Sequence, residues 1–343
     1  MDSSDTATGP ARSAPVAVLG SGSWGTALAI QYARAGRETR LWGRDPEQIA
    51  RLAADRVNAR YLPGATFPAA LKPEADLGHA LAGATDILVV VPSHAFRPLL
   101  DRIKPHLTPG QRVVWATKGF ERNTLLLPHQ VAREVLGDRV PTAVLSGPTF
   151  AREVGLGLPT AITVASTDSA FADDLARVLS NEYFRAYTSD DIIGVEVGGA
   201  VKNVIAVATG IADGLGFGAN TRAALITRGL AEMTRLGLVL GARPATFMGL
   251  AALGDLVLTC TDNQSRNRRF GLALAEGLGA DEALARIGQV VEGYEAARAV
   301  LAVSQRHGVD MPIANAVEQV LFEGVLATNA ARTLMERELR AEH

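Results

Sequence analysis

The sequence lacks the features that mark secreted, membrane and nucleic-acid-binding proteins. It has one cysteine, Cys260, so it cannot form an internal disulfide, and we interpret that residue as a buried bystander. No apolar run approaches the roughly 18 residues of a membrane span. The net charge of −2 gives no reason to expect a nucleic acid as a partner. Met1–Ala14 is polar and has no signal-peptide core, so we expect a frayed tail and a cytoplasmic protein.

Lysine is also scarce. Among 34 basic residues only four are lysines, and the rest are arginines. An ammonium group loses its proton at an accessible pH when it is desolvated, whereas a guanidinium does not. Lys72 and Lys104 precede prolines in polar surroundings, which predicts surface positions, but Lys118 and Lys202 lie in apolar, glycine-rich segments. These two lysines are therefore candidates for chemistry.

The stretch Val16–Ala29, VAVLGSGSWGTALA, organises the N-terminal half of the chain. An apolar strand leads into Gly20-Ser-Gly22-Ser-Trp-Gly25 and then into a helix. In such a loop the first glycine permits the turn, the second lets a pyrophosphate approach the backbone, and the third lets the helix pack on the strand. We expect a dinucleotide there, and a purely structural glycine turn is the alternative.

The second strand, Glu38–Trp42, ends in Gly43-Arg44-Asp45. A cofactor without a 2′-phosphate usually meets an acidic residue at this position. A small residue followed by a guanidinium suits a 2′-phosphate, so NADPH is favoured and NADH stays possible through Asp45. The alternative is that Arg44 is merely solvated.

Further apolar runs predict buried parallel strands at Asp86–Val91, Arg112–Ala116, Ala143–Leu145, Thr160–Ala165 and Tyr183–Tyr187. The pattern between Asn58 and Glu74 does not resolve whether a strand passes there. Because ligands lie beyond the carboxyl ends of such strands, Lys118 is expected to face the site. The sequence thus predicts an α/β, Rossmann-like doubly wound sheet.

From about Ile192 the pattern is helical, which predicts a second, all-α domain. We expect a tail at residues 1–14, a dinucleotide-binding domain at 15–191 and a helical substrate domain at 192–340. The helix around Gly198–Asn203 is apolar on nearly every side, so Lys202 would be buried and must be functional or paired. Helices are expected near Thr221–Leu240 and Thr246–Ala251, and Gln289–Gly293 is expected to be an extended link.

The segment Ser265-Arg266-Asn267-Arg268-Arg269 begins with a helix N-cap and continues with basic residues. The helix macrodipole favours acidic residues at that end. A bound anion would resolve the conflict, and an exposed basic helix start is the alternative.

Taken together, these pieces resemble the bacterial NAD(P)-dependent glycerol-3-phosphate dehydrogenases from about Pro15 to Glu336. The resemblance rests on GSGSWGTALA (20–29), ATKGF (116–120), SGPTFA (146–151), VGGAVKNVIA (197–206), MGLAALGDLVLTC (248–260), SRNRRFG (265–271) and VVEG (290–293). It implies reversible conversion of dihydroxyacetone phosphate and glycerol 3-phosphate, which supplies phospholipid backbones. It also implies a cytoplasmic enzyme that is frequently a homodimer.

The resemblance further implies roles for individual residues. Lys202 would be the proton donor and acceptor, while Lys118 and Arg266 would touch both cofactor and substrate. The remaining cofactor residues would be Ser23, Trp24, Arg44, Tyr61, Ala151, Val290 and Glu292, beside the loop glycines Gly20, Gly22 and Gly25. The remaining substrate residues would be Gly147, Thr149, Asp255, Ser265 and Asn267, with Lys202 itself in contact. No metal is expected.

Two other functions stay open at this point. One is a related dehydrogenase, a Rossmann domain followed by helices, that acts on a 3-hydroxy acid. The other is a non-catalytic NADPH-sensing module, which would not need a buried lysine beside Asp255. Burial would lower the pKa of Lys202 and a close Asp255 would raise it, so the net direction is not decided by the sequence.

Overall fold

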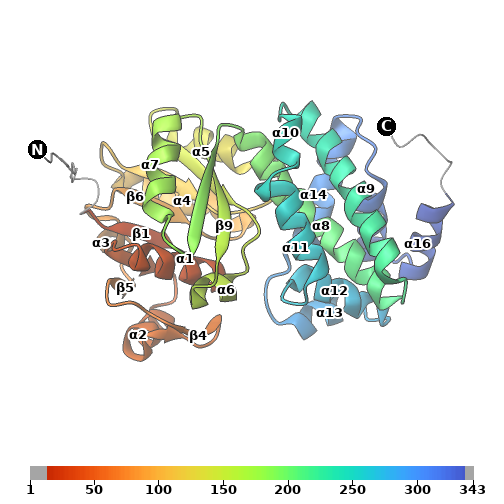
Figure 1. Ribbon diagram of the computed structural model, residues 1–343, viewed down its shortest axis with the longest axis horizontal. Helices are drawn as coiled ribbons and strands as arrows, with labels where there is room; N and C mark the ends of the chain where they lie inside the picture. The colour runs from red at the N-terminus through yellow and green to blue at the C-terminus, as the bar shows by residue number, and fades with distance from the viewer. Residues whose placement is uncertain (1–13, 337–343) are drawn as a thin grey trace, which may run out of the picture. The chain divides into compact units, whose positions relative to one another are not determined.

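The computed structural model describes residues 14–336 and divides into two compact units, which we describe separately (Figure 1). Unit 1 comprises the chain up to Thr117, with Ala132–Leu145 and Thr149–Asp190. Unit 2 comprises Lys118–Val131, Ser146–Pro148 and the chain from Asp191 onward. Two segments that follow strands in the N-terminal half thus belong to the same unit as the C-terminal helices.

Unit 1 is built on an eight-stranded sheet with the strand order β10-β9-β8-β7-β6-β1-β2-β5. The strands are β1 (Val16–Leu19), β2 (Thr39–Trp42), β5 (Leu71–Glu74), β6 (Asp86–Val89), β7 (Arg112–Trp115), β8 (Thr142–Ser146), β9 (Thr160–Ala165) and β10 (Phe184–Ser189). Strand β1 pairs in parallel with β2 on one side and with β6 on the other. The strand order reverses there, and open α/β sheets bind ligands at such a switch point.

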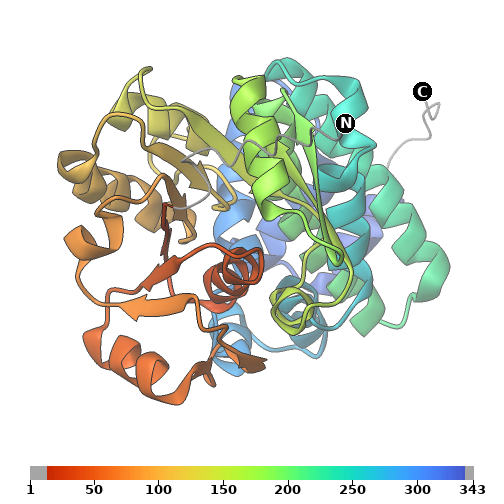
Figure 2. The same cartoon turned by 60° about the vertical axis from the view of Figure 1, so that its left-hand side comes forward.

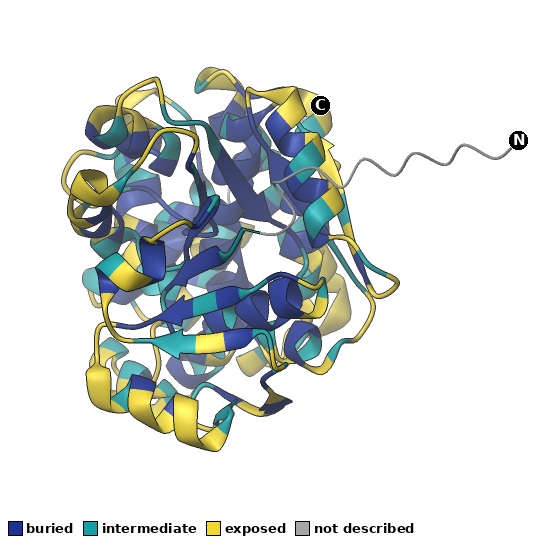
Figure 3. Ribbon diagram, turned by 90° about the vertical axis from the view of Figure 1, so that its left-hand side faces the viewer, coloured by how far each residue is buried: buried dark blue, intermediate teal, exposed yellow. Residues whose placement is uncertain are grey.

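The central strands are buried because helices pack on the sheet. All four residues of β1 and of β6 are buried, as expected for a parallel sheet covered on both faces (Figure 3). The helices of this unit are α1 (Ser23–Arg34), α2 (Pro46–Asp55), α3 (Leu77–Leu81), α4 (Ser93–Ile103), α6 (Ala151–Leu156) and α7 (Ser169–Leu179), together with the part of α5 (Pro128–Leu136) from Ala132 onward. A short 3₁₀ turn, η2 (Lys104–His106), follows α4.

The region that the sequence pattern left unresolved holds three strands. The short strands β3 (Val57–Asn58) and β4 (Leu62–Thr66) form an antiparallel pair near α2, below β5 in Figures 1 and 2. Strand β5 is the edge of the main sheet, next to β2. Its sequence LKPE lacks the apolar run by which buried strands are predicted, because Pro73 and two charged residues suit an edge strand.

Unit 2 is helical, and no strand lies between residues 192 and 336. Its elements are α8 (Ile192–Gly214), α9 (Gly218–Val239), α10 (Pro244–Phe247), the π-helical turn η3 (Leu250–Gly254), α11 (Asp255–Thr261), α12 (Arg266–Ala275), α13 (Ala280–Ile287), α14 (Glu292–Arg306), α15 (Pro312–Phe322) and α16 (Ala327–Met335). The predicted class, a Rossmann-like sheet followed by helices, is confirmed.

Helix α8 is the core of unit 2, and α9, α11, α12, α14 and α15 all pack against it. By length and composition alone, α8 and the segment Pro244–Thr261 could each cross a membrane. However, 94% of the apolar window of α8 is buried inside the protein, and Pro244–Thr261 is divided among α10, η3 and α11. The apolar character of α8 is therefore that of a core helix.

Two expected elements differ in the structure. The helix expected at Thr246–Ala251 is interrupted, because α10 ends at Phe247 and η3 begins at Leu250. The extended link expected at Gln289–Gly293 ends early, because α14 already begins at Glu292, where its acidic side chain suits the positive end of the helix.

Candidate active site

The glycine loop of unit 1 has the geometry of a dinucleotide-binding turn. Gly20 has φ +126°, and a Cβ there would lie 2.1 Å from the carbonyl oxygen of Val90. A Cβ at Gly25 would lie 1.8 Å from the carbonyl oxygen of Gly20, so the helix can pack this closely only on glycine. Nothing lies within 4 Å of a Cβ at Gly22. The space over Gly22 is open, and Gly22 caps α1 without a side-chain hydrogen bond, which leaves backbone N–H groups for an anion.

Two amide side chains hold this loop in place through hydrogen bonds. Asn58, which is buried, donates to the backbone oxygen of Ser21 (3.0 Å) and to Thr26 Oγ1 (2.8 Å). Gln48 donates to the same Ser21 oxygen at 3.2 Å. The sequence gives no signal for this role, because the two residues lie in segments whose pairing with the loop is set only by the fold.

The end of β2 is shaped by packing as well as by charge. A Cβ at Gly43 would lie 2.4 Å from Ser21 Oγ, so a side chain there would collide with the glycine loop. Arg44 is exposed. Asp45 caps α2 by accepting from the N–H groups of Glu47 (3.0 Å) and Gln48 (3.3 Å). The charge of Arg44 is thus exposed to solvent at this strand end, whereas the carboxylate of Asp45 is already engaged as the N-cap of α2.

The other predicted residues in unit 1 are dispersed around these elements. Ser23 and Trp24 are in the first turn of α1, both half-buried, and Trp24 packs against the core of the unit. The ring of Tyr61 is half-buried, with the guanidinium carbon of Arg60 5.0 Å from its centre. Thr149 and Ala151 flank the start of α6, whose N-cap has no side-chain hydrogen bond.

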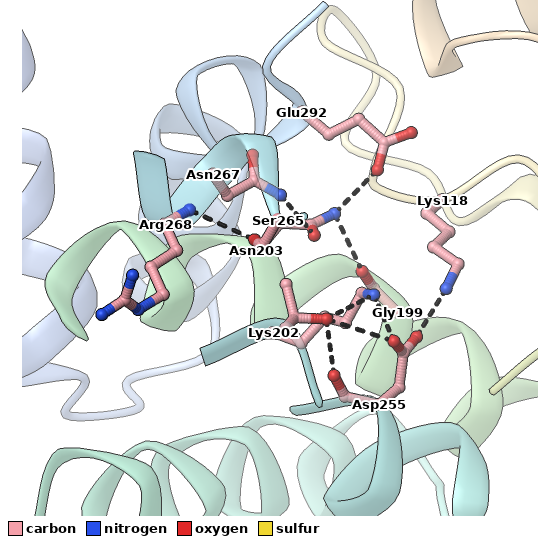
Figure 4. A network of polar contacts seen from close by, with 10 residues as sticks. Lys118, Gly199, Lys202, Asn203, Asp255, Ser265, Asn267, Arg268 and Glu292 are labelled. Carbon is pink, nitrogen blue, oxygen red and sulfur yellow. Dashed lines mark hydrogen bonds and ion pairs between the residues drawn. The ribbon is translucent and has the colours of Figure 1, made fainter. Parts of the chain in front are cut away.

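Unit 2 holds a buried cluster of two lysines and one carboxylate (Figure 4). Lys118 Nζ donates to Asp255 Oδ2 at 2.6 Å, and Lys202 Nζ donates to Asp255 Oδ1. Lys202 Nζ also donates to Thr259 Oγ1 at 3.0 Å. The side chains of Asp255 and Lys202 are only 3% and 9% exposed. Both lysines singled out by their scarcity therefore meet on one carboxylate.

The sequence of α8 explains how this cluster forms. A Cβ at Gly198 would lie 2.7 Å from the carbonyl oxygen of Ala251, so glycine lets α8 approach the turn η3. In η3 the Gly254 N–H reaches back to the Gly249 carbonyl oxygen (3.1 Å), and Asp255 follows directly. Lys202 is four residues after Gly198, on the same face of α8, and therefore meets Asp255.

The pKa values of the two lysines shift in opposite directions. Burial lowers the pKa of Lys202 to about 8, against the attraction of Asp255 and with the help of the Lys118 charge. Burial also opposes the charged form of Lys118, but Asp255 outweighs it and raises the pKa of Lys118. Burial opposes the charged form of Asp255 too, yet the two ammonium groups lower its pKa. The question that the sequence left open is answered for Lys202 in favour of burial.

A second network, made of amides, lies beside the cluster (Figure 4). Asn203 Nδ2 donates to Glu292 Oε2 at 2.9 Å, and Asn203 Oδ1 accepts from Asn267 Nδ2 at 2.7 Å. Asn267 Oδ1 accepts from the Gly293 N–H at 2.8 Å. The network joins α8, α12 and α14, and so connects the predicted residues Asn267 and Glu292. Val290, two residues before α14, is 45% exposed.

The start of α12 shows which of its basic residues are already paired. Ser265 caps the helix by accepting from the Arg268 N–H at 3.2 Å, as predicted from the sequence. Arg268 is buried and its guanidinium donates to Asp213 at 2.6 Å, a carboxylate that it shares with Arg222, so it is already paired within the protein. Arg266 is half-buried, and no ion pair involving it is found within residues 14–336.

Asn203, Thr259 and Asn58 have roles in the structure that were not predicted from the sequence. Thr259 is four residues after Asp255 on a helix, a spacing that places both on one face and could have identified it. Asn203 follows Lys202 directly, but its bond to Glu292 spans 89 positions and depends on tertiary packing. Among the described residues, no group of three or more His, Cys, Asp or Glu side chains could hold a metal ion.

Comparisons with known proteins cover nearly the whole chain. Residues 15–172 match the family model for the NAD-dependent glycerol-3-phosphate dehydrogenase N-terminus, and residues 191–332 match that for the C-terminus. The glycerol-3-phosphate dehydrogenase [NAD(P)+] of Yersinia pestis is 59% identical over 330 residues, which covers 96% of this chain and 97% of the relative. The protein of the same name from Yersinia pseudotuberculosis is equally similar.

Two solved structures agree with these matches. The glycerol-3-phosphate dehydrogenase of Coxiella burnetii superposes with a TM-score of 0.92 at 50% identity, covering 95% of this chain and 99% of that chain. The glycerol-3-phosphate dehydrogenase of Saccharomyces cerevisiae has a TM-score of 0.81 at 26% identity, with 94% and 100% covered.

The shared carboxylate predicts a specific effect of Asp255→Asn. The change leaves two buried ammonium groups without their counter-charge, and we expect a loss of about 3 to 5 kcal/mol in the free energy of unfolding near pH 7. Lysines without a counter-charge have lowered pKa values in the folded state, so the variant should regain stability as the pH rises from 7 toward 10.

Urea unfolding at several pH values measures this effect. The control is Glu276→Gln, because Glu276 pairs with Arg286 on the surface and exposed pairs contribute only about 0 to 1 kcal/mol. An Asp255→Asn variant as stable as the control at pH 7 would contradict the description of the cluster as a buried, charge-coupled site.

Proposed function

The chain belongs to the NAD-dependent glycerol-3-phosphate dehydrogenase family, and we propose that it interconverts dihydroxyacetone phosphate and sn-glycerol 3-phosphate with a nicotinamide dinucleotide. The observation that carries this proposal is the buried Lys118–Asp255–Lys202 cluster. It joins two ammonium groups of different acidity on one carboxylate, in a chain that has only two other lysines, Lys72 and Lys104. We propose Lys202 as the catalytic residue.

The two lysines are suited to different tasks because their pKa values are separated. With a pKa of about 8, Lys202 exists in both protonation states near neutral pH and can deliver or accept a proton. Lys118, whose pKa is raised, keeps its charge throughout and can hold the oxygen atoms of an anionic substrate. Asp255 fixes the positions of both Nζ atoms. It would keep Lys202 in place when the amine of Lys202 becomes neutral.

The proposed reduction adds a hydride and a proton to the carbonyl group of the substrate. A reduced nicotinamide dinucleotide, when bound, would supply a hydride to the carbonyl carbon of the substrate. As the C–H bond forms, the π electrons of the carbonyl move to its oxygen, where negative charge develops. The Lys202 ammonium stabilises this charge and gives the oxygen a proton. In the oxidation direction neutral Lys202 takes the hydroxyl proton instead.

The start of α12 supports phosphate binding. Arg266 offers a guanidinium, and Ser265 keeps its own hydroxyl proton to donate, because its oxygen accepts from Arg268. Asn267 has one Nδ2 proton in use toward Asn203 and a second that is available. The remaining substrate contacts that we propose come from Gly147 and Thr149.

The glycine loop of unit 1 supports dinucleotide binding, since the open space over Gly22 and the uncapped start of α1 fit a pyrophosphate. We propose that NADPH is preferred over NADH because Arg44 is exposed at the end of β2 where an acidic residue would favour NADH. The other cofactor residues that we propose are Ser23, Trp24, Tyr61, Lys118, Ala151, Arg266, Val290 and Glu292.

The family also suggests a cellular setting for the enzyme. We propose a cytoplasmic homodimer whose product enters phospholipid biosynthesis. The two alternatives raised by the sequence, a 3-hydroxy acid dehydrogenase and a non-catalytic NADPH sensor, are not supported, because both halves of the chain match one enzyme family.

NADPH oxidation tests the activity directly. We expect turnover with dihydroxyacetone phosphate and a kcat/KM at least roughly 100-fold lower with unphosphorylated dihydroxyacetone, because binding energy at the phosphate positions the carbonyl. Lys202→Met, which should still fold, serves as the inactive control and should lose roughly 10²- to 10⁴-fold in kcat. Better turnover of a 3-keto acid such as acetoacetate would contradict the proposal.

The pKa of Lys202 predicts mirror-image pH profiles. Reduction needs the ammonium form, so kcat/KM should fall as the pH rises through about 8, whereas for oxidation it should rise over the same range. Lys202→Arg keeps the charge and should abolish both limbs along with most activity. Lys72→Arg, on an exposed lysine, is the control and should leave both profiles unchanged. Profiles that are flat between pH 7 and 9 in the unmodified enzyme would count against Lys202 as acid and base.

Cofactor preference is tested at Arg44. A charged hydrogen bond contributes about 1.5 to 3 kcal/mol, so Arg44→Ala should lower kcat/KM for NADPH by roughly 10- to 150-fold and spare NADH. Arg51→Ala, another exposed arginine nearby on α2, is the matched control. Equal losses with both cofactors would show that Arg44 does not read the 2′-phosphate.

A further inference from the structure

One hydroxyl beside the lysine cluster has no hydrogen-bond partner within the described part of the chain. Ser146, the last residue of β8, is 3% exposed, and its Oγ atom is fully buried and unpaired. Buried polar groups in native proteins are almost always satisfied, and one left unpaired destabilises the folded state. Few side-chain atoms of the described residues are buried and unpaired, and the Ser146 hydroxyl is one of them, beside the lysine cluster.

The position of Ser146 places this hydroxyl next to the catalytic elements of unit 2. A Cβ built on Gly199 of α8 would lie 3.3 Å from Lys118 Cγ and 3.5 Å from Ser146 Oγ. The side chain of Lys118 and the hydroxyl of Ser146 therefore border the same point on α8. Because residue 199 is glycine, this position of α8 places no side chain against the hydroxyl.

The segment that carries Ser146 also reaches the other side of the cluster. Two residues later, Pro148 Cγ lies 3.5 Å from the point where a Cβ of Gly254 would be, and Gly254 directly precedes Asp255. Ser146–Pro148 thus packs against α8 and against the turn that presents Asp255. The side chain of Ser146 is thus positioned by packing on both sides of this segment and not by a side-chain hydrogen bond.

Resting on the proposed function, we propose that Ser146 is a further substrate-binding residue, whose hydroxyl donates to an oxygen atom of the three-carbon phosphorylated substrate. Lys118 has only donors, and a serine hydroxyl has one donor and two acceptors. A ligand bound between them must therefore present oxygen acceptors, as a hydroxyl, carbonyl or phosphate group does. The hydroxyl has no hydrogen bond within the protein that it would have to give up when the ligand binds. Its new hydrogen bond to the ligand therefore contributes fully to the binding free energy.

Ser146→Ala tests this inference through substrate binding and KM, two quantities that would not change if the hydroxyl had only a structural role. Removing an orphan hydroxyl should leave the melting temperature of the ligand-free protein unchanged or slightly higher. The rise in melting temperature caused by saturating sn-glycerol 3-phosphate should shrink, because weaker binding stabilises less. The KM for dihydroxyacetone phosphate should increase by roughly 3- to 10-fold, the effect of one hydrogen bond, while the shift caused by NADPH alone stays the same.

Tyr32→Phe is the matched control. Its hydroxyl is also buried and unpaired, but it lies in α1 of unit 1. This variant should leave both the shift caused by sn-glycerol 3-phosphate and the KM unchanged.

The outcomes separate this inference from the proposed function. If the unmodified enzyme does not reduce dihydroxyacetone phosphate, the proposed function fails. If it does, and Ser146→Ala keeps the same KM and the same ligand-induced shift, the hydroxyl does not contact substrate and the inference is overturned. A large drop in the melting temperature of the ligand-free variant would likewise overturn it, since that result would assign Ser146 a structural bond.

Discussion

The charge of Asp255 is the constraint on which the helical unit depends. Two ammonium groups are buried against it, one from α8 and one from the segment after β7. Neither lysine would be tolerated in this apolar interior without a counter-charge, because an isolated buried ion is strongly destabilising. The elements that bring the three side chains together must therefore be held firmly, and the packing of α8 shows how this is done.

Neighbouring helices pack against α8 so closely that only glycine fits at some of the contacts. A Cβ at Gly210 would lie 2.1 Å from the carbonyl oxygen of Arg268 in α12, and one at Gly293 would lie 2.6 Å from the carbonyl oxygen of Asn203. Glycine in a helix interior is destabilising by roughly 1 kcal/mol relative to alanine. Here that loss is offset by close contact between helices, and the contact fixes the distance between Lys202 and the groups that surround it.

Much of the fold and of the candidate site could be predicted from the sequence, because these features depend on residues that are close together in the chain. The glycine loop, the buried strands and the N-cap at Ser265 depend on nearby residues, and the scarcity of lysine singled out Lys118 and Lys202. Strand β5 was hidden by its proline, and the turn η3 by its resemblance to an ordinary helix. The bond between Asn203 and Glu292, the pairing of Arg268 with Asp213 and the direction of the Lys202 pKa shift all depend on tertiary contacts that no local pattern encodes.

The two polar networks differ in the charge that they place around Lys202. The groups that join α8, α12 and α14 are mainly the neutral amides of Asn203 and Asn267, and only Glu292 adds a charge, which slightly favours the ammonium form of Lys202. Arg268, a cation that would lower the pKa of a nearby lysine, is paired with Asp213, a carboxylate that it shares with Arg222. An uncharged donor such as Ser146 fits the same rule. It can add a hydrogen bond to a substrate beside Lys118 without altering the charge balance that separates the acidities of the two lysines.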